Sequence, residues 1–353
     1  MRNIIWIRRL ALVGIVLCFG VVVLGAYTRL ADAGLGCPDW PGCYGHFTPA
    51  GAAANITNVE SAWPGLTFES RKAWIEMIHR YAATTLGFII VLITALAYAA
   101  RRERVVSLPF AAFMLAVVVM QGVLGMLTVT WLLKPLIVTG HLIGGLTTLG
   151  LLVWLWLTVR ARTAVGTIAS SDSQLAPQPS AAWRRAQRFA ALAFAALILQ
   201  ILLGGWTSTN YAAMACPDLP KCQNEWVPEA DYADAFVLWR GLDINYAGGV
   251  LDHPARVAIH FTHRLGAIVA SCLLILAAFA AIRLGSAAVR NAALLVLAAL
   301  VLQITIATAM VLKTFPLTLA AAHNAGAALL LIGIIALTRS LRPVHMPPPT
   351  AGS

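Results

Sequence analysis

The stretch EMIHRYAATTLGFIIVLITALAYA, residues 76–99, joins a histidine to an apolar run that is long enough to cross a bilayer. A second stretch, HFTHRLGAIVASCLLILAAFAAI at residues 260–282, carries the same histidine–arginine pair followed by a similar run. A helix needs about 20 apolar residues to cross a hydrocarbon core roughly 30 Å thick. Both stretches therefore predict membrane-spanning helices with a histidine near one end.

The composition of the whole chain supports the same conclusion. Its 353 residues are 60% hydrophobic and 11% charged, whereas soluble domains carry about a quarter charged residues. This difference excludes an ordinary soluble protein, and we predict an all-α integral membrane protein with eight transmembrane helices. The predicted spans are residues 10–27, 73–99, 106–131, 136–159, 187–207, 255–282, 288–312 and 317–338.

The charge distribution predicts the orientation of the chain. The termini and the loops after the second, fourth and sixth spans hold fifteen basic and two acidic side chains, which leaves ten basic and twelve acidic ones on the other side. Basic loops remain in the cytoplasm, so we expect both termini there. The net charge of +11 is then a consequence of topology in membrane lipid, and we expect no nucleic-acid partner.

The chain contains an internal repeat at offsets of 179 to 184 residues. Aligned landmarks are residues 25–43 with 204–222, His79-Arg80 with His263-Arg264, Gln121 with Gln303, and His141 with His323. Membrane proteins are often built by such duplication. Because each half has an even number of spans, the two halves are predicted to be parallel.

The repeat defines the domain boundaries that we predict. A small, polar and proline-containing stretch, TAVGTIASSDSQLAPQPS, is typical of a linker. We expect two tandem four-helix bundles, with an N-terminal half at 1–162, a cytoplasmic linker at 163–186, a C-terminal half at 187–340 and a cytoplasmic tail at 341–353.

Four histidines lie at about the same depth near the outer ends of their spans, namely His79, His141, His263 and His323. A histidine inside a membrane is costly. One alone is more often a hydrogen-bonded packing residue, but four at one depth, paired by the duplication, indicate a functional site. Two imidazoles that face each other across a four-helix bundle suit axial ligation of haem iron, whereas zinc sites generally use more ligands at shorter spacings. We therefore predict one haem in each half. His260 is an alternative to His263, although the repeat favours His263.

The residues beside these histidines suggest further roles. Arg80 and Arg264 each follow a predicted ligand and could bind haem propionates, because a guanidinium suits a carboxylate, or could reach towards lipid headgroups. Glu76 and His260 occupy equivalent places three residues before the ligands, on the same helix face. We interpret Glu76 as a candidate for proton transfer, with simple pairing to Arg80 or Lys72 as the alternative.

The motif Cys-Pro-Asp-X-Pro-X-Cys occurs once in each half, in the large outer loops. Its two prolines favour a tight turn, and an oxidising outer compartment favours disulfides. We expect Cys37 to pair with Cys43 and Cys216 with Cys222. Each pair is interpreted as a structural staple, with a redox-active pair as the alternative, because sequence does not define a potential.

Taken together, the eight spans, the duplication, the Glu-X-X-His-Arg motif and the four histidines resemble the haem A synthases, the Cox15/CtaA family. That family oxidises the C8 methyl group of haem O to a formyl group, which gives haem A for terminal oxidases. The resemblance implies that His79 and His141 hold the substrate haem O, that His263 and His323 ligate a haem b cofactor, and that Glu76 is the essential glutamate.

The resemblance also implies an oxidoreductase of the bacterial inner (cytoplasmic) membrane. Haem O synthase and a quinone or other electron acceptor are the candidate partners. Two other functions fit part of the pattern. A bis-histidine cytochrome b-type electron-transfer protein would explain both histidine pairs but gives Glu76 no task, and a quinone-linked periplasmic thiol oxidase would use the cysteines but not the histidines. A transporter is favoured least, because the spans are not interrupted at mid-bilayer.

Overall fold

The computed structural model describes residues 2–64, 66–103, 106–166 and 180–342. Within these ranges, eight helices are long and apolar enough to cross a membrane, and no strand is formed apart from isolated bridges in two loops. The eight are α1 (Arg2–Leu30), α4 (Ser70–Ala99), α5 (Leu108–Thr130), α6 (Pro135–Gly166), α7 (Ala181–Thr209), α9 (His253–Ile282), α10 (Ala287–Leu312) and α11 (Leu317–Ser340). The prediction of an all-α, multi-pass membrane protein is confirmed.

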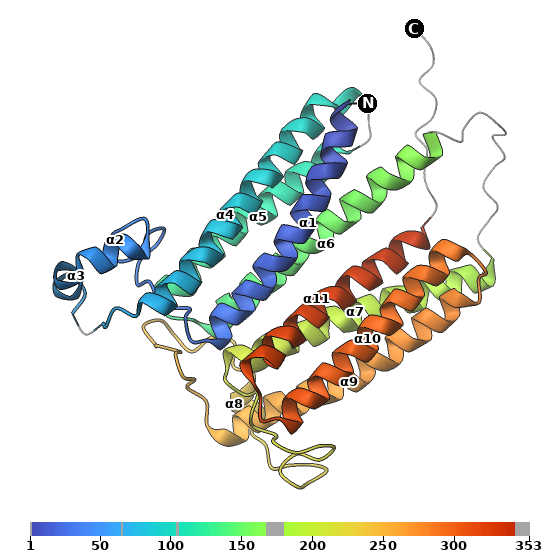
Figure 1. Cartoon of the computed structure of the whole chain (residues 1–353). Helices are drawn as coiled ribbons and strands as arrows, with labels where there is room; N and C mark the ends of the chain where they lie inside the picture. The colour runs from blue at the N-terminus through green and yellow to red at the C-terminus, as the bar shows by residue number, and fades with distance from the viewer. Residues whose placement is uncertain (1, 65, 104–105, 167–179, 343–353) are drawn as a thin grey trace.

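Four short helices complete the described chain: α2 (Pro49–Ala54), α3 (Ile56–Ala62), α8 (Tyr232–Ala235) and the 3-10 helix η1 (Arg101–Glu103). Figure 1 shows α2, α3 and α8 at the end of the long helices that is remote from the start of α1. The two cysteine motifs belong to the same outer loops as these helices. The loops that carry the cysteine motifs of both halves are therefore gathered on one side of the membrane-spanning region.

The long helices form two four-helix bundles (Figure 1). In the first bundle α1 and α5 each pack against both α4 and α6, so that α4 and α6 lie diagonally opposite. In the second, α7 and α10 each pack against both α9 and α11, which places α9 and α11 diagonally opposite in the same way. This arrangement is consistent with the predicted tandem bundles. The helices that carry the predicted ligands are diagonal partners in each bundle.

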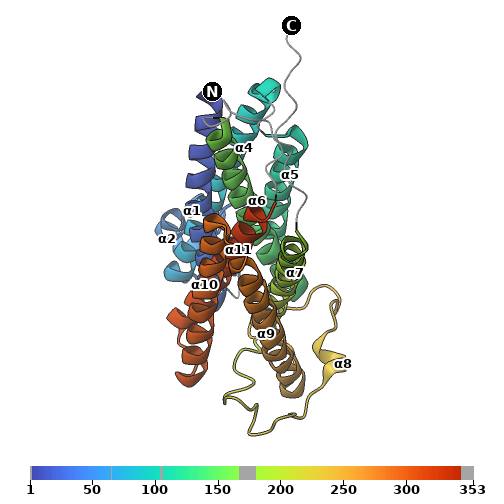
Figure 2. The same ribbon diagram turned by 90° about the vertical axis from the view of Figure 1, so that its right-hand side faces the viewer.

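The two bundles pack through α1 and α6 of the first and α7 and α11 of the second. Figure 2 shows α6 and α11 side by side at this junction. One continuous apolar cluster runs through both bundles, while large apolar side chains such as Val16 and Val301 stay about two-thirds exposed on the outside. Exposed apolar surface of this kind is stable only in lipid.

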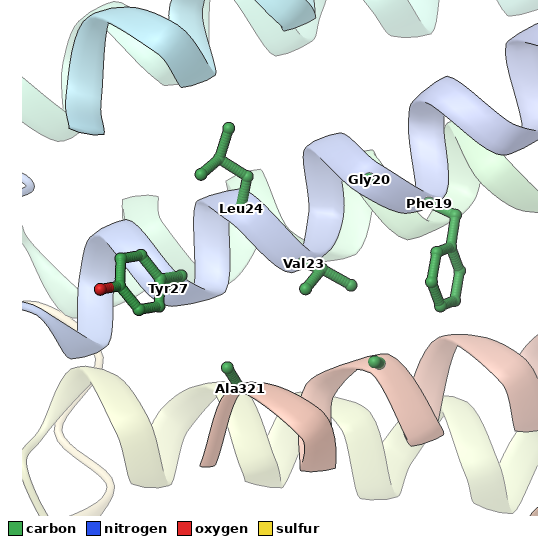
Figure 3. Close-up of a pocket in the computed structure, with 7 residues that line it drawn as sticks. Phe19, Gly20, Val23, Leu24, Tyr27 and Ala321 are labelled. Atoms are coloured by element: carbon green, nitrogen blue, oxygen red, sulfur yellow. The ribbon is translucent and has the colours of Figure 1, made fainter. Parts of the chain in front are cut away.

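An apolar groove of about 380 Å³ lies between α1 and α11 (Figure 3). Its lining residues are Phe19, Gly20, Val23, Leu24, Tyr27, Ala321 and Ala325. The small side chains on α11 leave this space beside the larger ones on α1. The groove therefore follows from a mismatch in side-chain size along the junction of the bundles.

The outer loop of the second half also reaches the first bundle. Lys134, which is buried, donates to the backbone carbonyl of Gly241, and its ammonium lies 3.4 Å from the ring centroid of Trp239. The backbone N–H of Tyr246 donates to the carbonyl of Leu132 at 3.1 Å. Desolvated cation–π contacts are worth about 2 kcal/mol. These contacts hold the two halves together at the outer side.

The predicted linker at 163–186 differs from the structure at both ends. Helix α6 continues to Gly166, and α7 begins at Ala181 after Ser180, whose hydroxyl accepts a hydrogen bond from the N–H of Trp183. The indole N–H of Trp183 and the amide of Gln187 donate to the carbonyl of Leu341, at the end of α11. Residues 167–179 of the predicted linker and 343–353 of the predicted tail lie outside the described residues.

Candidate functional site

His79 on α4 and His141 on α6 approach each other inside the first bundle. Their ring centroids are 6.4 Å apart and their planes are inclined by 80°. An imidazole–metal bond is about 2 Å long, so two imidazoles on opposite sides of one iron have centroids roughly 6 Å apart. The spacing of this pair therefore fits one haem iron between the two rings.

Glycines on the neighbouring helices give the histidine rings their space. A Cβ atom added to Gly25 on α1 would lie 2.8 Å from Cε1 of His79, and one added to Gly204 on α7 would lie 3.0 Å from Cε1 of His263. Real Cβ atoms essentially never approach another atom as closely as 2.8 Å. Gly25 and Gly204 are repeat equivalents, at the offset of 179 residues. Only glycine permits the observed ring position in the first half.

In the second bundle each predicted ligand is touched by a glutamine. Nε2 of Gln200 lies 3.0 Å from Nδ1 of His263, and Nε2 of Gln303 lies 3.2 Å from Nδ1 of His323. Gln303 corresponds to Gln121 of the first half, and each side chain lies against a helical glycine of the adjacent helix, Gly144 on α6 for Gln121 and Gly326 on α11 for Gln303. These glutamines were not predicted as site residues. The alignment of Gln121 with Gln303 was a signal for one of them, whereas Gln200 has Val21 at its equivalent place.

Buried polar atoms without a hydrogen-bond partner gather at the two histidine sites. Six such side-chain atoms occur among the described residues: Nδ1 of His79 and of His141, Nε2 of Gln121, Oε1 of Gln200 and of Gln303, and Nε of Arg256. Buried polar atoms are normally hydrogen-bonded, so a cluster of exceptions indicates where a bound group completes the surroundings. Because of these unpartnered atoms, the residues at the histidine sites of both bundles fit a bound haem.

Each histidine ring of the first site lies near a backbone carbonyl. The backbone carbonyls of Val21 and Gln121 lie close to the rings of His79 and His141, but no hydrogen bond of normal geometry is formed. A metal-binding histidine usually donates its other N–H to such a carbonyl. In the described part of the chain, no group of three or more His, Cys, Asp or Glu side chains is placed to hold a bare metal ion. The two imidazoles alone supply fewer ligands than a zinc site generally uses.

Glu76 lies one turn from His79, buried beneath the first cysteine loop. Its Oε2 accepts a hydrogen bond from the backbone N–H of Cys37 at 2.9 Å, and its Oε1 accepts one from Nη2 of Arg80 at 2.5 Å. The side chain is 5% exposed. The carboxylate therefore connects the histidine site to the disulfide loop, with its charge balanced by the arginine.

His260 performs the same task in the second half. Its Nδ1 accepts a hydrogen bond from the backbone N–H of Cys216 at 3.2 Å, which is the repeat equivalent of the contact between Glu76 and Cys37. Because this ring is used by the loop, its position favours His263 as the ligand of the second site. The choice between His260 and His263 remains a prediction.

Arg80 and Arg264 are directed at the cysteine loops. Nη1 of Arg80 donates to the carbonyls of Asp39 and Gly42 at 3.0 and 2.5 Å. Arg264 donates to the equivalent carbonyls of Asp218 and Lys221 at 2.8 and 2.9 Å, and to Cys216 at 2.7 Å. The guanidiniums thus fasten each loop to its helix, and their predicted contact with propionates remains a prediction.

Both predicted disulfides are confirmed. Cys37–Cys43 and Cys216–Cys222 each have a Cα–Cα distance of 4.7 Å, and all four cysteines are at most 1% exposed. Thiol–disulfide exchange requires access for an attacking thiolate. The burial therefore favours the structural interpretation over redox exchange with a partner.

A carboxylate stabilises each cysteine loop from within. Asp39 accepts hydrogen bonds from the backbone N–H groups of Tyr44 and Gly45, and Asp218 accepts them from those of Gln223 and Asn224. Desolvation acts in the opposite direction, but these backbone donors hold the pKa of the Asp218 carboxyl below its usual range. The loop geometry is therefore duplicated down to its hydrogen bonds.

Comparison with known proteins identifies a family that matches this duplicated chain. The family COX15-CtaA, described as cytochrome oxidase assembly protein, matches residues 8–335, which is nearly the whole chain. The chain belongs to the COX15-CtaA family. The matched range includes both cysteine loops and all four predicted ligands.

Relatives within COX15-CtaA are similar over most of their length. The Heme A synthase of Shewanella oneidensis is 40% identical over 332 residues, which cover 94% of each chain. The Heme A synthase of a Chelativorans species is 28% identical and covers 94% of this chain and 89% of its own. That of Halalkalibacterium halodurans is 23% identical, with 76% and 75% covered. The chain is thus similar to these proteins over at least three quarters of its length.

Proposed function

We propose that the protein is a haem A synthase, which oxidises the C8 methyl group of haem O to a formyl group. The observation that carries the proposal is the pair His79 and His141, whose rings are spaced for one haem, with the buried carboxylate of Glu76 one turn away. The relatives named Heme A synthase support it. The product would serve the assembly of a terminal oxidase.

The two bundles are given different tasks in this proposal. His79 and His141 hold the substrate haem O, and His263 and His323 hold a haem b cofactor. Haem b, when bound, supplies one-electron redox chemistry. A quinone or another membrane acceptor would receive the electrons. Gln200 and Gln303 orient the two imidazoles of the second site through the contacts at 3.0 and 3.2 Å.

In this proposal Glu76 accepts protons that the oxidation releases. Oxidation of a methyl group to a formyl group adds one oxygen atom, and when water supplies that atom the step releases protons as well as electrons. A positioned carboxylate can accept a proton. The N–H of Cys37 and the guanidinium of Arg80 hold the Glu76 oxygens at 2.9 and 2.5 Å. The first cysteine loop therefore positions the carboxylate and covers the outer side of the site.

The sites are placed towards the outer side of the bacterial inner membrane, with both termini in the cytoplasm. His79 lies nine residues into α4 and His141 six residues into α6, which corresponds to about 9 to 14 Å along the helix axis. Haem O is an amphiphile and would enter from the lipid phase. Haem O synthase is the partner that would supply it.

Co-expression with a haem O synthase tests the proposed function. Haems extracted from membranes that contain both proteins should include the formyl product, identified by chromatography and mass, and membranes with the synthase alone should contain only haem O and haem b. A preparation that holds haem b but never yields the formyl product would instead indicate an electron relay. Loss of product only after replacement of all four loop cysteines by serine, with both histidine pairs dispensable, would indicate a thiol oxidase.

Gly25 and Gly204 leave room for the rings of His79 and His263, so substitution of either glycine should displace the histidine beside it. We expect Gly25→Ala to lower haem A yield by roughly tenfold or more, because a displacement near 1 Å at a reacting centre can cost about 100-fold. Gly204→Ala should lower the amount of retained haem b. Alanine raises helix propensity by about 1 kcal/mol, so a loss is not explained by a weaker helix.

Gly20→Ala is the matched control for this experiment. Gly20 is on the same helix as Gly25, but a Cβ there would meet no atom within 4 Å. Haem content and product yield should match those of the parent. Equal haem content and product yield in Gly20→Ala and Gly25→Ala would contradict the interpretation that Gly25 leaves room for the His79 ring.

A further inference from the structure

Arg256 lies at the outer end of the second bundle, in the first turn of α9. It precedes His263 by seven residues, which is close to two full helical turns, so both side chains project from the same face of α9. The separation along the helix axis is about 10 Å. A group that binds His263 and extends outward would therefore reach Arg256.

The Arg256 side chain lacks a protein partner. Its Nε is buried without a hydrogen bond, and none of the ion pairs or cation–ring contacts found among the described residues includes it. A partly buried guanidinium without an anion is unfavourable. The other five unpartnered buried polar atoms all belong to the two histidine sites. Nε of Arg256 is thus the sixth unpartnered buried polar atom among the described residues.

We propose that Arg256 binds a carboxylate of the group held by His263 and His323, namely a propionate of haem b. This inference rests on the proposed function. A guanidinium presents paired N–H donors that match a carboxylate. Arg264, the cation adjacent to the ligand in sequence, already donates to the carbonyls of Cys216, Asp218 and Lys221. Arg256 is the cation on the ligand face whose donors remain available.

The first half has a weaker version of this site. Lys72 precedes His79 by seven residues, as Arg256 precedes His263. Its ammonium is already paired with Oε1 of Glu69 at 2.8 Å, whereas the place equivalent to Glu69 in the second half is taken by His253. A carboxylate ligand must compete with Glu69 in the first site, whereas in the second no carboxylate of the described residues is paired with Arg256. The second site therefore retains its haem, and the first can release the product.

Retention of haem b measures this contact without requiring activity. The full-length protein is purified in detergent, its b-type haem per chain is determined from the visible spectrum, and transfer of haem to excess apomyoglobin is timed. We expect Arg256→Gln to speed the transfer roughly 10-fold or more, because hydrogen bonds to charged groups contribute at that level. Arg256→Lys, which keeps the charge but loses the paired donors, should fall between Arg256→Gln and the parent.

Lys313→Gln is the control, because it removes an exposed charge at the C-cap of α10, outside the helix that carries Arg256 and His263. Its transfer rate should equal that of the parent. Reconstitution with haem b dimethyl ester, which has no carboxylates, should abolish the difference between the parent and Arg256→Gln. Equal transfer rates for the parent and Arg256→Gln with ordinary haem b would overturn the inference. A difference between these two proteins that persists with the ester would also overturn it. So would an Arg256→Lys transfer rate equal to that of Arg256→Gln. Parent protein that binds no haem at all would instead overturn the proposed function.

Discussion

Glu76→Gln is expected to lower haem A formation by about 100-fold or more while haem b stays bound. The magnitude is that of a lost general base. Glutamine has nearly the same shape and can still accept the N–H of Cys37, so the cysteine loop should keep its place. What it lacks is the negative charge that now meets Arg80 at 2.5 Å. The measurement is the ratio of haem A to haem O in extracts, with haem b content as the test of folding.

Glu76→His separates the chemical role of the carboxylate from its structural one. The second half already shows that a histidine at this place holds its cysteine loop, through Nδ1 of His260 and the N–H of Cys216. If Glu76 only anchors the loop, Glu76→His should retain most of the product. We expect it to lose haem A as fully as Glu76→Gln does, with haem b unchanged. Substantial haem A from either variant would remove Glu76 from the chemistry and leave it as a positioning residue.

His260→Gln provides the matched control in the other half. A glutamine oxygen can accept the N–H of Cys216, so the loop contact survives. Haem A formation should stay within a few-fold of the parent, because hydrogen-bond replacements of this kind cost about 1 kcal/mol. A loss comparable to that of Glu76→Gln would indicate that His260 itself is a ligand, in place of His263.

The membrane-spanning helices were predictable because lipid leaves the backbone few alternatives. Each long apolar run became a helix, since every N–H and carbonyl must be paired within the segment. Helix ends were less accurate. Hydropathy falls at Arg184 and Arg185, yet α7 starts before them, because Ser180 caps its first turn and Trp183 packs against the end of α11. Hydrogen bonding, which hydropathy does not measure, decides where such a helix begins.

The candidate site was predictable where it depends on periodicity and repetition. Spacing and duplication were enough to propose His79 and His141 as partners, and their rings are 6.4 Å apart. The direction of Arg80 could not be predicted in this way. Its adjacency to His79 suggested a propionate, but the path of the cysteine loop brings the carbonyls of Asp39 and Gly42 within its reach. Loop paths depend on long-range contacts and leave no periodic signal.

His323→Ala and His141→Ala should both abolish haem A formation, but only His323→Ala should remove haem b. Each histidine is on one of the two diagonal helices of its own bundle. His323→Ala removes one of the two proposed haem b ligands, so purified protein should lose most of its haem b and, with it, its haem A formation. His141→Ala should keep haem b and still form almost no haem A.

The pattern of these two losses decides which bundle performs the chemistry. Both variants remove the same side chain from equivalent places in the repeat, so a general destabilisation would affect them alike. His253→Ala is the control, because His253 is exposed at the start of α9, outside both pairs. Visible spectra give retained haem b, and chromatography of extracts gives haem A. Loss of haem b in His141→Ala with retention in His323→Ala would exchange the two assignments. It would also disagree with the position of Glu76, since the buried carboxylate is at the first site and the second has His260 in its place.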